Sequence, residues 1–353
     1  MSEPLIEVEN LDIEYNLGNS TLKAVTDASF TIDENEFFGL VGESGSGKST
    51  VAKSIIGGLD ENGEVTSGTI RYKGEEIQDY SDQQFSENIR WKEISLIPQA
   101  SMNSLDPIMR IDRQAVELAD THTDWSEEEA VDRLHELFEI VGLPKERVYD
   151  YPHQFSGGMQ QRAIIALALF LKPSLLIADE PTTALDVIMQ DQVLKHLDEI
   201  KETQDISMIL ITHDISVVFE TCDSLSVLHG GHIAEEGDIE AVYDEPRHPY
   251  TILLQEAFPD IRFPDRELGV IEGKPPELTG EVDFCTFADR CPWAYEECRQ
   301  GLPPLEQLDN DTDHLTSCLR SDEMESLAAD YLQKPDEDMA IDPRSNAIGD
   351  SDD

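Results

Sequence analysis

The sequence predicts an α/β protein built on a largely parallel sheet, and three short apolar segments carry this prediction. Leu175–Ala178 and Met208–Ile211 are continuous apolar runs, which are typical of strands buried on both faces in a parallel sheet. Phe38–Val41 is a similar run, and a glycine-rich loop and the helix-forming segment Val51–Ile56 follow it directly. Strand, loop and helix in this order indicate a parallel α/β unit.

The segments around this unit indicate further elements. Residues 5–41 alternate apolar and polar side chains, which predicts strands, and Gly63–Tyr72 predicts another strand. Glu127–Phe138 has apolar residues near a 3.6-residue period, an acidic first turn and Ser126 as a candidate N-cap. We therefore expect an α/β core that carries a helical insertion.

The pattern breaks near residues 246–250, where a smaller region that contains cysteines begins. Beyond about residue 325 the chain is acidic and poor in apolar residues, which is typical of disorder. We expect three units: a core over residues 1–255 with a helical subdomain at about 100–160, a cysteine domain over 256–325, and a disordered tail over 326–353.

The composition limits the partners and the setting of the protein. The 353 residues include 75 acidic and 25 basic side chains, a formal charge of −50. Such a surface repels bare nucleic acid and anionic lipid at ordinary salt, so we expect no nucleic-acid partner. An acidic surface also serves ordinary solubility, but its spread over the whole chain favours a halophilic source, since molar salt shortens the Debye length to about 3 Å.

Targeting signals are not evident in the sequence. The N-terminus lacks the basic residues and apolar core of a signal peptide. The longest apolar run, Ala163–Leu171, has nine residues and is too short to cross a bilayer. We expect a cytoplasmic protein whose membrane role, if any, comes through a partner.

The most specific motif is Gly42–Thr50, which fits the pattern G-x-x-x-x-G-K-S/T of phosphate-binding loops. Its glycines let backbone N–H groups approach phosphate oxygens, and the following helix adds its positive N-terminus. Lys48 would reach the β- and γ-phosphates, and the Ser49 hydroxyl would bind Mg²⁺. A chance glycine-rich turn is the alternative, which the flanking strand and helix disfavour. The residues expected to bind phosphate are Gly42, Ser44, Gly45, Ser46, Gly47, Lys48, Ser49 and Thr50.

Further polar segments stand in a fixed order around this loop. In chain order they are Tyr15, Gln99, the serine-glycine turn Phe155–Arg162, the pair Asp179 and Glu180, Asp186, and His213. Gln99, the acidic pair and His213 each come just past an apolar strand, which places them at one edge of the sheet. Alone, His213 or Tyr15 would more often be structural, so the joint pattern carries the inference.

These motifs in this order resemble the ATP-binding-cassette (ABC) ATPases, and the resemblance covers residues 5 to about 255. It implies a P-loop core with an N-terminal antiparallel β subdomain, binding ATP and Mg²⁺. By this resemblance Tyr15 would stack on adenine, Gln99 would touch Mg²⁺ and the attacking water, and His213 would contact the γ-phosphate. Asp179 would hold Mg²⁺ together with Ser49, and Glu180 would be the general base.

The resemblance also implies an ATP site shared between two subunits. Ser156, Gly157 and Gly158 would contact the γ-phosphate of ATP on the opposite subunit, and Asp186 would bridge the subunits. The family's usual leucine and glutamine in this turn are Phe155 and Met159 here. Because the Ser-Gly-Gly core is kept, we expect the contact with ATP to survive.

Three stretches narrow the resemblance to the ATPase subunits of oligopeptide and dipeptide importers. They are Tyr151–Met159, Thr182–Val187, and His248–Thr251 followed by Cys285–Pro292. The same branch includes relatives that handle nickel or sugars, so the solute is not fixed. The resemblance implies two membrane-spanning permease subunits, a homologous ATPase or a second copy, an extracytoplasmic solute-binding protein, and a place at the cytoplasmic face of the cell membrane.

Four of the five cysteines are clustered: Cys285, Cys291, Cys298 and Cys318, with spacing C-x₅-C-x₆-C-x₁₉-C. In a cytosolic protein such a cluster favours a metal over disulfides, but the C-x₂-C pairs of typical zinc sites are missing. Four cysteines and a Cys-Pro step suit an iron–sulfur cluster, and the family resemblance supports a [4Fe-4S] assignment. Zinc, with His314 as a substitute ligand, and no metal at all are the alternatives. Cys222 is expected to pack in the core.

The sequence thus predicts an ABC ATPase that powers peptide import. A soluble ABC ATPase that acts on ribosomes or DNA is the main alternative, but such proteins usually carry two cassettes or a long coiled-coil insertion. An exporter subunit is a third possibility, which the C-terminal extension disfavours. Which solute is carried, and whether the ATPase pair is a homodimer or a heterodimer, are not determined by the sequence.

Overall fold

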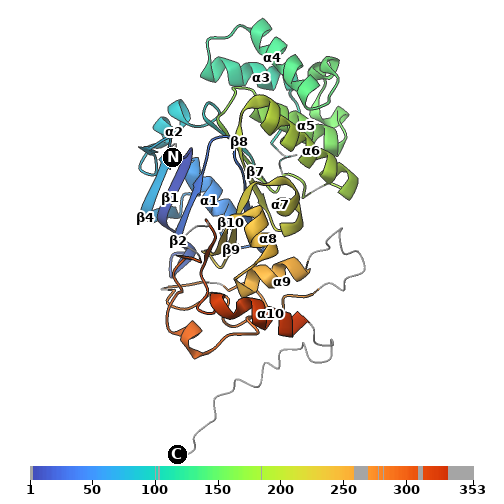
Figure 1. Ribbon diagram of the computed structural model, residues 1–353. Coiled ribbons are helices and arrows are strands. Elements are labelled where there is room, and N and C mark those ends of the chain that lie inside the picture. The colour runs from blue at the N-terminus through green and yellow to red at the C-terminus, as the bar shows by residue number, and fades with distance from the viewer. Residues whose placement is uncertain are drawn as a thin grey trace, which may run out of the picture.

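The computed structural model describes residues 3–99, 101, 104–183, 185–257, 269–276, 278–280, 282–308 and 313–332. Figure 1 shows the N-terminal strands at one side, the helices α3 and α4 at one end, and the C-terminal region at the other end. Most of the tail expected to be disordered, residues 333–353, lies outside the described residues.

The N-terminal strands form a four-stranded antiparallel sheet in the order β2-β1-β4-β5. Its strands are β1 (Ile6–Asn16), β2 (Thr21–Ile32), β4 (Gly63–Tyr72) and β5 (Glu75–Glu76). The central strand β1 pairs with β2 on one side and β4 on the other, and its buried residues alternate with more exposed ones. The alternating pattern in the sequence thus reflects a sheet with one buried face.

The larger sheet has eight strands in the order β11-β12-β10-β9-β3-β8-β7-β6. Its parallel part consists of β9 (Ser224–His229), β3 (Phe37–Val41), β8 (Ser207–Thr212), β7 (Leu175–Asp179) and β6 (Ile94–Ile97). All five residues of β3 and β7 and all six of β8 are buried, which confirms the prediction of central parallel strands. The carboxyl ends of β3, β6, β7 and β8 therefore meet at one edge.

Helix α1 (Lys48–Ile55) packs between the two sheets. Its side chains Val51, Ala52 and Ile55 share an apolar cluster with residues of both sheets, including Leu175 and Ile177 of β7. The alternate residues of β7, Leu176 and Ala178, belong to a second apolar cluster on the other face of the sheet. Helix α2 (Asp82–Asn88) follows β5 and buries Phe85 in the same apolar cluster as α1.

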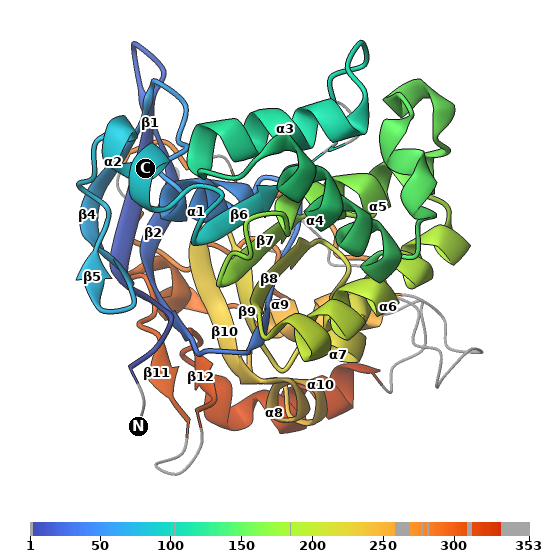
Figure 2. The same cartoon turned by 90° about the horizontal axis from the view of Figure 1, so that it is seen from above.

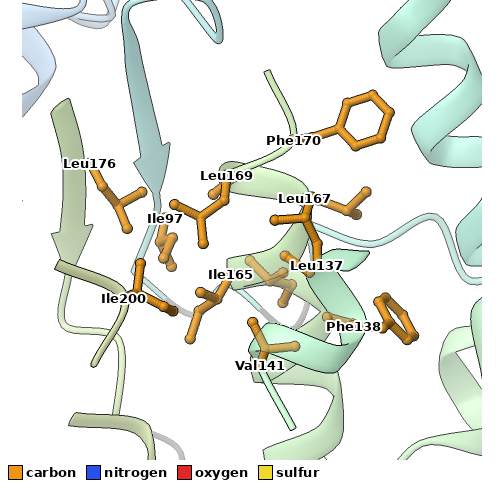
Figure 3. Close-up of a cluster of buried hydrophobic side chains, with 14 of the residues drawn as sticks. Ile97, Leu137, Phe138, Val141, Ile165, Leu167, Leu169, Phe170, Leu176 and Ile200 are labelled. Atoms are coloured by element: carbon orange, nitrogen blue, oxygen red, sulfur yellow. The ribbon is translucent and has the colours of Figure 1, made fainter. Parts of the chain in front are cut away.

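The opposite face of the parallel strands carries the helices α3 (Ile111–His122), α4 (Glu127–Ile140), α5 (Gly157–Ala168) and α6 (Val187–Gln204), with short 3₁₀ turns at Lys145–Tyr149 and Pro152–Gln154. Figure 2 shows α3, α4 and α5 stacked over β6 and β7. Figure 3 shows Ile97 and Leu176 from the sheet facing Ile165 and Leu169. The predicted helix with its Ser126 N-cap is confirmed as α4, since Ser126 accepts a hydrogen bond from the Glu129 N–H.

The remaining elements lead into the C-terminal region. Helix α7 (Ile215–Thr221) follows β8, and the hairpin β9–β10 (His232–Asp238) is followed by α8 (Ile239–Asp244) and α9 (Pro249–Ala257). The C-terminal strands β11 (Glu306–Gln307) and β12 (Leu315–Thr316) extend the large sheet, because β12 pairs with β10. The cysteine region is therefore joined to the core by strand pairing.

The start of the predicted disordered tail is corrected by the structure. Helix α10 (Met324–Leu332), after 3₁₀ turns at Glu296–Arg299 and Ser321–Glu323, includes the first residues of that tail. Met324, Leu327, Ala328 and Tyr331 lie on one face of α10 and pack in a cluster with Trp293. This helical spacing gives the segment an apolar face that its acidic composition hides.

Candidate functional site

The phosphate loop lies between the end of β3 and the start of α1, as the sequence predicts. Gly42 and Gly47 have φ angles of 155° and 103°, which side chains rarely allow. A Cβ at Gly42 would lie 2.1 Å from the Leu228 carbonyl oxygen, and one at Gly47 would lie 2.4 Å from that of Ala24. Glycine is therefore required twice for the loop to approach the neighbouring strands closely.

Lys48 is folded back over this loop. Its Nζ donates to the carbonyl oxygens of Gly42 at 2.7 Å and Glu43 at 2.8 Å. Burial lowers the pKa of the Lys48 ammonium to about 8, while the carboxylates of Glu180, Asp179 and Glu43 oppose this shift. The Lys48 ammonium is therefore poorly solvated, which favours its binding to an anion at the phosphate loop.

The end of β7 supplies the two predicted carboxylates. The Ser49 hydroxyl donates to Asp179 Oδ1 at 3.1 Å, which joins the start of α1 to the end of β7. Burial raises the pKa of the Asp179 carboxyl, and the hydrogen bond from Ser49 opposes this. A hydroxyl and a carboxylate side by side are oxygen ligands of the kind that Mg²⁺ prefers.

Glu180 is held in a distinct backbone and hydrogen-bond setting. Its φ of 46° lies in the left-handed region, and its N–H donates to the Ile211 carbonyl of β8. Gln99 Nε2 lies 2.9 Å and Thr183 Oγ1 2.8 Å from Glu180 Oε2, while His213 Nδ1 lies 3.4 Å from Oε1. The backbone strain is retained where the side chain must point into the cleft.

The protonation of Glu180 follows from these contacts. Burial would raise its pKa, but the hydrogen bonds from Thr183 and Gln99 and the charge of His213 outweigh burial, and the net pKa lies below its ordinary value. Glu180 is therefore a carboxylate at neutral pH, able to accept a proton. The predicted residues Gln99, Glu180 and His213 thus form one hydrogen-bonded group.

A cleft of about 280 Å³ lies over the phosphate loop. Its lining includes the aromatic ring of Tyr15 and the polar side chains of Lys48, Ser49, Gln99 and Glu180. Gly63 on β4 lies against the Tyr15 ring, where a Cβ would come within 2.7 Å of it. The cleft therefore combines an aromatic side chain with charged ones, as a nucleotide needs.

The C-terminal region contributes to this cleft, which the sequence did not predict. Pro276 and Leu278 line it beside Tyr15 and Leu22. The Lys23 N–H donates to the Leu278 carbonyl, and Leu22 pairs with Thr279. These contacts join positions more than 250 residues apart in the chain, so no local pattern could have indicated them.

The serine-glycine turn and Asp186 are not brought to this cleft. Ser156 is the N-cap of α5 and accepts from the Met159 N–H, while Asp186 is the N-cap of α6 and accepts from the Met189 N–H. Both residues are exposed, and neither lines the cleft that holds Lys48. Within one chain the predicted site is therefore only half assembled.

The four clustered cysteines line one small pocket together with Trp293 and Met324. None of the five cysteines forms a disulfide. Backbone N–H groups of Phe287, Trp293 and Arg320 donate to the sulfurs of Cys285, Cys291 and Cys318. Among the described residues, no three His, Cys, Asp or Glu side chains are arranged to hold a metal ion.

Two other expectations about single residues are settled by their positions. His314 is not a substitute ligand at the cysteine pocket, because the pairing of β12 with β10 places its Nε2 2.8 Å from Glu235 Oε1. Cys222 packs against apolar clusters of the core, as predicted.

The fold and the site together define an ABC-type ATPase. Residues 25–183 match the family described as ABC transporter, and residues 234–298 match the family described as oligopeptide/dipeptide transporter, C-terminal region. The chain is 40% identical over 298 residues to the oligopeptide transport ATP-binding protein OppD of Haemophilus influenzae, covering 84% of this chain and 92% of that protein. It is 38% identical to the dipeptide transport ATP-binding protein DppD of Bacillus subtilis, covering 91% and 96%.

Solved structures give the same class. A dimeric ATP-binding cassette in a post-hydrolysis state with ADP and Pi is 29% identical, with a TM-score of 0.59, and the match covers 66% of this chain and 98% of that chain. An ABC transporter subunit of Clostridium perfringens is 27% identical, with a TM-score of 0.60, covering 69% and 92%. The chain belongs to the ATP-binding proteins of the oligopeptide/dipeptide ABC transporter family.

Helices able to cross a membrane are missing from the described part of the chain, since none there is both long and apolar enough.

Proposed function

We propose that this chain hydrolyses ATP at the cytoplasmic face of the cell membrane and so drives the uptake of di- and oligopeptides through two permease subunits. The observation that carries this proposal is the joint match of the ABC core and the oligopeptide/dipeptide C-terminal region in one chain. Uptake of nickel or a sugar remains the alternative, because the solute is selected by partners. A role on ribosomes or DNA has no counterpart among the relatives described above.

In the proposed reaction, the phosphate loop binds the β- and γ-phosphates, and Lys48 donates to them through its remaining N–H while keeping its contacts with Gly42 and Glu43. Ser49, Asp179 and Gln99 would hold Mg²⁺, which neutralises the charge that develops on the phosphates. Their hydroxyl, carboxylate and amide oxygens suit this ion. Tyr15, which lines the same cleft, would stack on the adenine.

Glu180 would accept the proton of the attacking water. Gln99 orients this carboxylate through its 2.9 Å hydrogen bond and His213 lies on its other oxygen, so both are placed to reach the γ-phosphate region. Thr183 holds the same oxygen as Gln99, which leaves the carboxylate little freedom to turn.

We propose that the second half of the site comes from another ATPase subunit. Ser156, Gly157 and Gly158 begin α5 at an exposed helix N-terminus, where backbone N–H groups favour an anion. A homologous chain or a second copy, placed head to tail, would present this turn to the γ-phosphate, and Asp186 would lie at the contact between the subunits. ATP would then close the dimer and hydrolysis would reopen it.

The permease contact is proposed at an apolar groove on the core. The groove, of about 310 Å³, lies between the segment that leads to Gln99 and helix α5. Its apolar lining includes Trp91, Leu96, Pro98, Leu105 and Ile164. A short permease helix seated there would touch both the Gln99 loop and the helical insertion.

We propose a [4Fe-4S] cluster at Cys285, Cys291, Cys298 and Cys318. All four thiols line one pocket, and three of the sulfurs accept backbone N–H bonds, which stabilise the negative sulfur of a cluster ligand. A single zinc ion would need its ligands about 2.3 Å from one point. Among the described side chains no group of three is placed to hold a metal ion, and the proposal rests on the pocket that the four thiols share.

We also propose that the protein works at high salt. Its formal charge of −50 is spread over the core and the C-terminal region alike, and concentrated salt screens the resulting repulsion.

The test is a gentle affinity purification from native membranes in molar KCl without oxygen, with every co-purifying chain identified. Two polytopic membrane proteins and a solute-binding protein are expected. The complex is then placed in vesicles, and its ATPase rate is measured with peptides, nickel or sugars. Stimulation by peptides supports the proposal. Stimulation by nickel or a sugar instead makes that compound the solute and contradicts peptide uptake, and recovery with ribosomal or DNA-repair proteins overturns the importer assignment.

A further inference from the structure

Glu43 is the acidic residue inside the phosphate loop Gly42–Thr50. A carboxylate at this position opposes phosphate binding by like-charge repulsion. The lining of the cleft does not include Glu43, although it includes Ser44 and Gly45 beside it. Its carboxylate instead forms two parallel hydrogen bonds with Arg290, from Nη1 to Oε2 at 2.5 Å and from Nη2 to Oε1 at 2.9 Å.

Arg290 comes from the cysteine region and is fixed on every side. Its side chain is 6% exposed, and its Nε donates to the Glu272 carbonyl at 2.9 Å. Its guanidinium lies over the Phe287 ring, and Nη1 lies 3.2 Å from His229 Nε2. Burial, with the charge of Arg290 in addition, lowers the pKa of His229 to about 3, so His229 is neutral and can accept this bond.

The backbone of Glu43 is held from two directions. Its N–H donates to the Tyr250 hydroxyl at 2.8 Å, and its carbonyl accepts from Lys48 Nζ at 2.8 Å. Tyr250 packs on His229 and Phe287, the two rings beside Arg290. The residue that positions the Lys48 ammonium is therefore the same residue that Arg290 and Tyr250 hold in place.

We propose that Arg290 is a positioning residue for ATP binding: its ion pair turns the Glu43 carboxylate away from the phosphates and fixes the peptide group that holds Lys48. The inference rests on the proposed assignment of the loop and Lys48 to the ATP phosphates. Because Arg290 directly precedes Cys291, it links the folded cysteine region to the affinity of the ATP site. A bidentate pair suits this role, since it fixes orientation as well as charge.

The experiment is a double-mutant cycle on the full-length protein. The variants are Arg290→Met, Glu43→Gln and both together, and the measurements are the Kd of a fluorescent ATP analogue, the Tm and the iron content of each. Arg299→Met is the matched control, because Arg299 also stands beside a clustered cysteine, Cys298, but pairs with the exposed Asp289.

Arg290→Met is expected to raise the Kd for ATP by about tenfold or more, because it leaves an unpaired carboxylate beside the phosphates. Glu43→Gln removes the repulsion along with the pair, and its Kd is expected to change by about threefold or less. The double variant is expected to bind ATP better than Arg290→Met alone. Arg290→Lys keeps the positive charge but cannot form the two parallel hydrogen bonds, so its Kd for ATP should lie between those of wild type and Arg290→Met.

The proposal is overturned if Arg290→Met lowers the Tm but binds ATP as tightly as Arg299→Met, which would make the pair merely structural. It is also overturned if the losses in Arg290→Met and Glu43→Gln simply add in the double variant. Should Arg290→Met fail to fold, the Kd of Arg290→Lys against wild type decides in the same way. If wild type itself binds no ATP, or Lys48→Ala binds it unchanged, the proposed function fails instead.

Discussion

The α/β core and the C-terminal cysteine region meet at the phosphate loop, but they are held together differently. The core has five parallel strands and helices packed in two large apolar clusters, and it shares a third with the C-terminal region through Phe287. The described C-terminal segment has strands of two residues, short 3₁₀ turns and the helix α10, whose Met324 packs with Trp293 and with Ile252 of the core. The core is stabilised by burial, whereas the C-terminal region depends on its contacts with the core, to which the proposed metal cluster would add.

The difference also divides the chemistry between the two regions. The residues proposed to act on ATP, including Lys48, Asp179 and Glu180, all lie on the core. The C-terminal region supplies one wall of the cleft through Pro276 and Leu278, and the partner of Glu43 through Arg290. We infer that changes in the core act on the hydrolysis rate, while changes in the C-terminal region act on affinity and stability.

The largest expected effect tests the chemical role of the core. Glu180→Gln should lower kcat for ATP hydrolysis by about 10²- to 10⁴-fold, because the amide cannot accept the proton of water. The Kd for ATP should stay within about threefold of wild type, since the phosphate contacts come from the loop. Steady-state hydrolysis and nucleotide titration measure the two quantities. Glu128→Gln, an exposed change on α4, is the control, and near-normal turnover of Glu180→Gln would reject Glu180 as the base.

The second effect tests what holds the C-terminal region. Cys291→Ser should remove bound iron and lower the free energy of unfolding of this region by several kcal/mol, on the order expected when a structural metal site is lost. Iron analysis, visible absorption and thermal unfolding of protein purified without oxygen measure this. Cys222→Ala removes a thiol from the core instead and should leave the iron content unchanged. Wild-type protein without iron, or with zinc in its place, would contradict the cluster.

A third prediction concerns charge repulsion, which both regions share. Transfer from molar KCl to dilute buffer should lower the Tm by about 10 °C, since the formal charge of −50 is then poorly screened. If the C-terminal region depends on fewer apolar contacts, its unfolding should be the first transition seen. Calorimetry at a series of KCl concentrations tests this, and a Tm that is independent of salt would exclude adaptation to high salt.

The smallest effect lies at the strand that joins the two regions. Glu236 on β10 accepts a hydrogen bond from Ser226, and burial raises its pKa from 4.5 to about 8. Between these values the folded protein keeps a proton that the unfolded chain releases, so stability should fall as the pH rises from about 5 to 8.

Glu236→Gln mimics the protonated acid, so its loss of unfolding free energy between pH 5 and pH 8 should be about 1–2 kcal/mol smaller than in wild type. The expected difference is kept to this size because Glu236 is partly exposed to solvent, which weakens the effect of its charge. Urea unfolding at pH 5.5 and pH 8 in constant salt measures the change. Glu240→Gln, an exposed change on α8, should keep the wild-type slope. An unchanged slope in Glu236→Gln would show that other groups cause the pH dependence.

Much of the core and of the ATP site could be predicted because their signals are local. The loop Gly42–Thr50, the buried strands β7 and β8 and the capped helix α4 each follow from a pattern within about fifteen residues. The meeting of Gln99, Glu180 and His213 was also predictable, since the carboxyl ends of parallel strands share one edge.

The contacts between the regions could not be predicted in this way. Arg290 and Glu43 are 247 positions apart, and nothing in the sequence near either residue indicates a contact with the other. His314 was a possible substitute ligand only under the zinc alternative, and the pairing of β12 with β10 places it on Glu235. The part of α10 from residue 326 onward was expected to be disordered, because its acidic composition conceals an apolar face that packs against Trp293.

The sequence by itself determined the class of site, because the spacing of glycines, carboxylates and strand-forming residues is fixed by backbone geometry over short distances. Only the tertiary structure decided that the C-terminal region reaches this site, with Leu278 on the cleft and Arg290 on Glu43. Backbone pairing of Leu278 and Thr279 with β2, and of β12 with β10, joins these distant segments to the core. These pairings depend on the burial of whole faces and not on any local pattern.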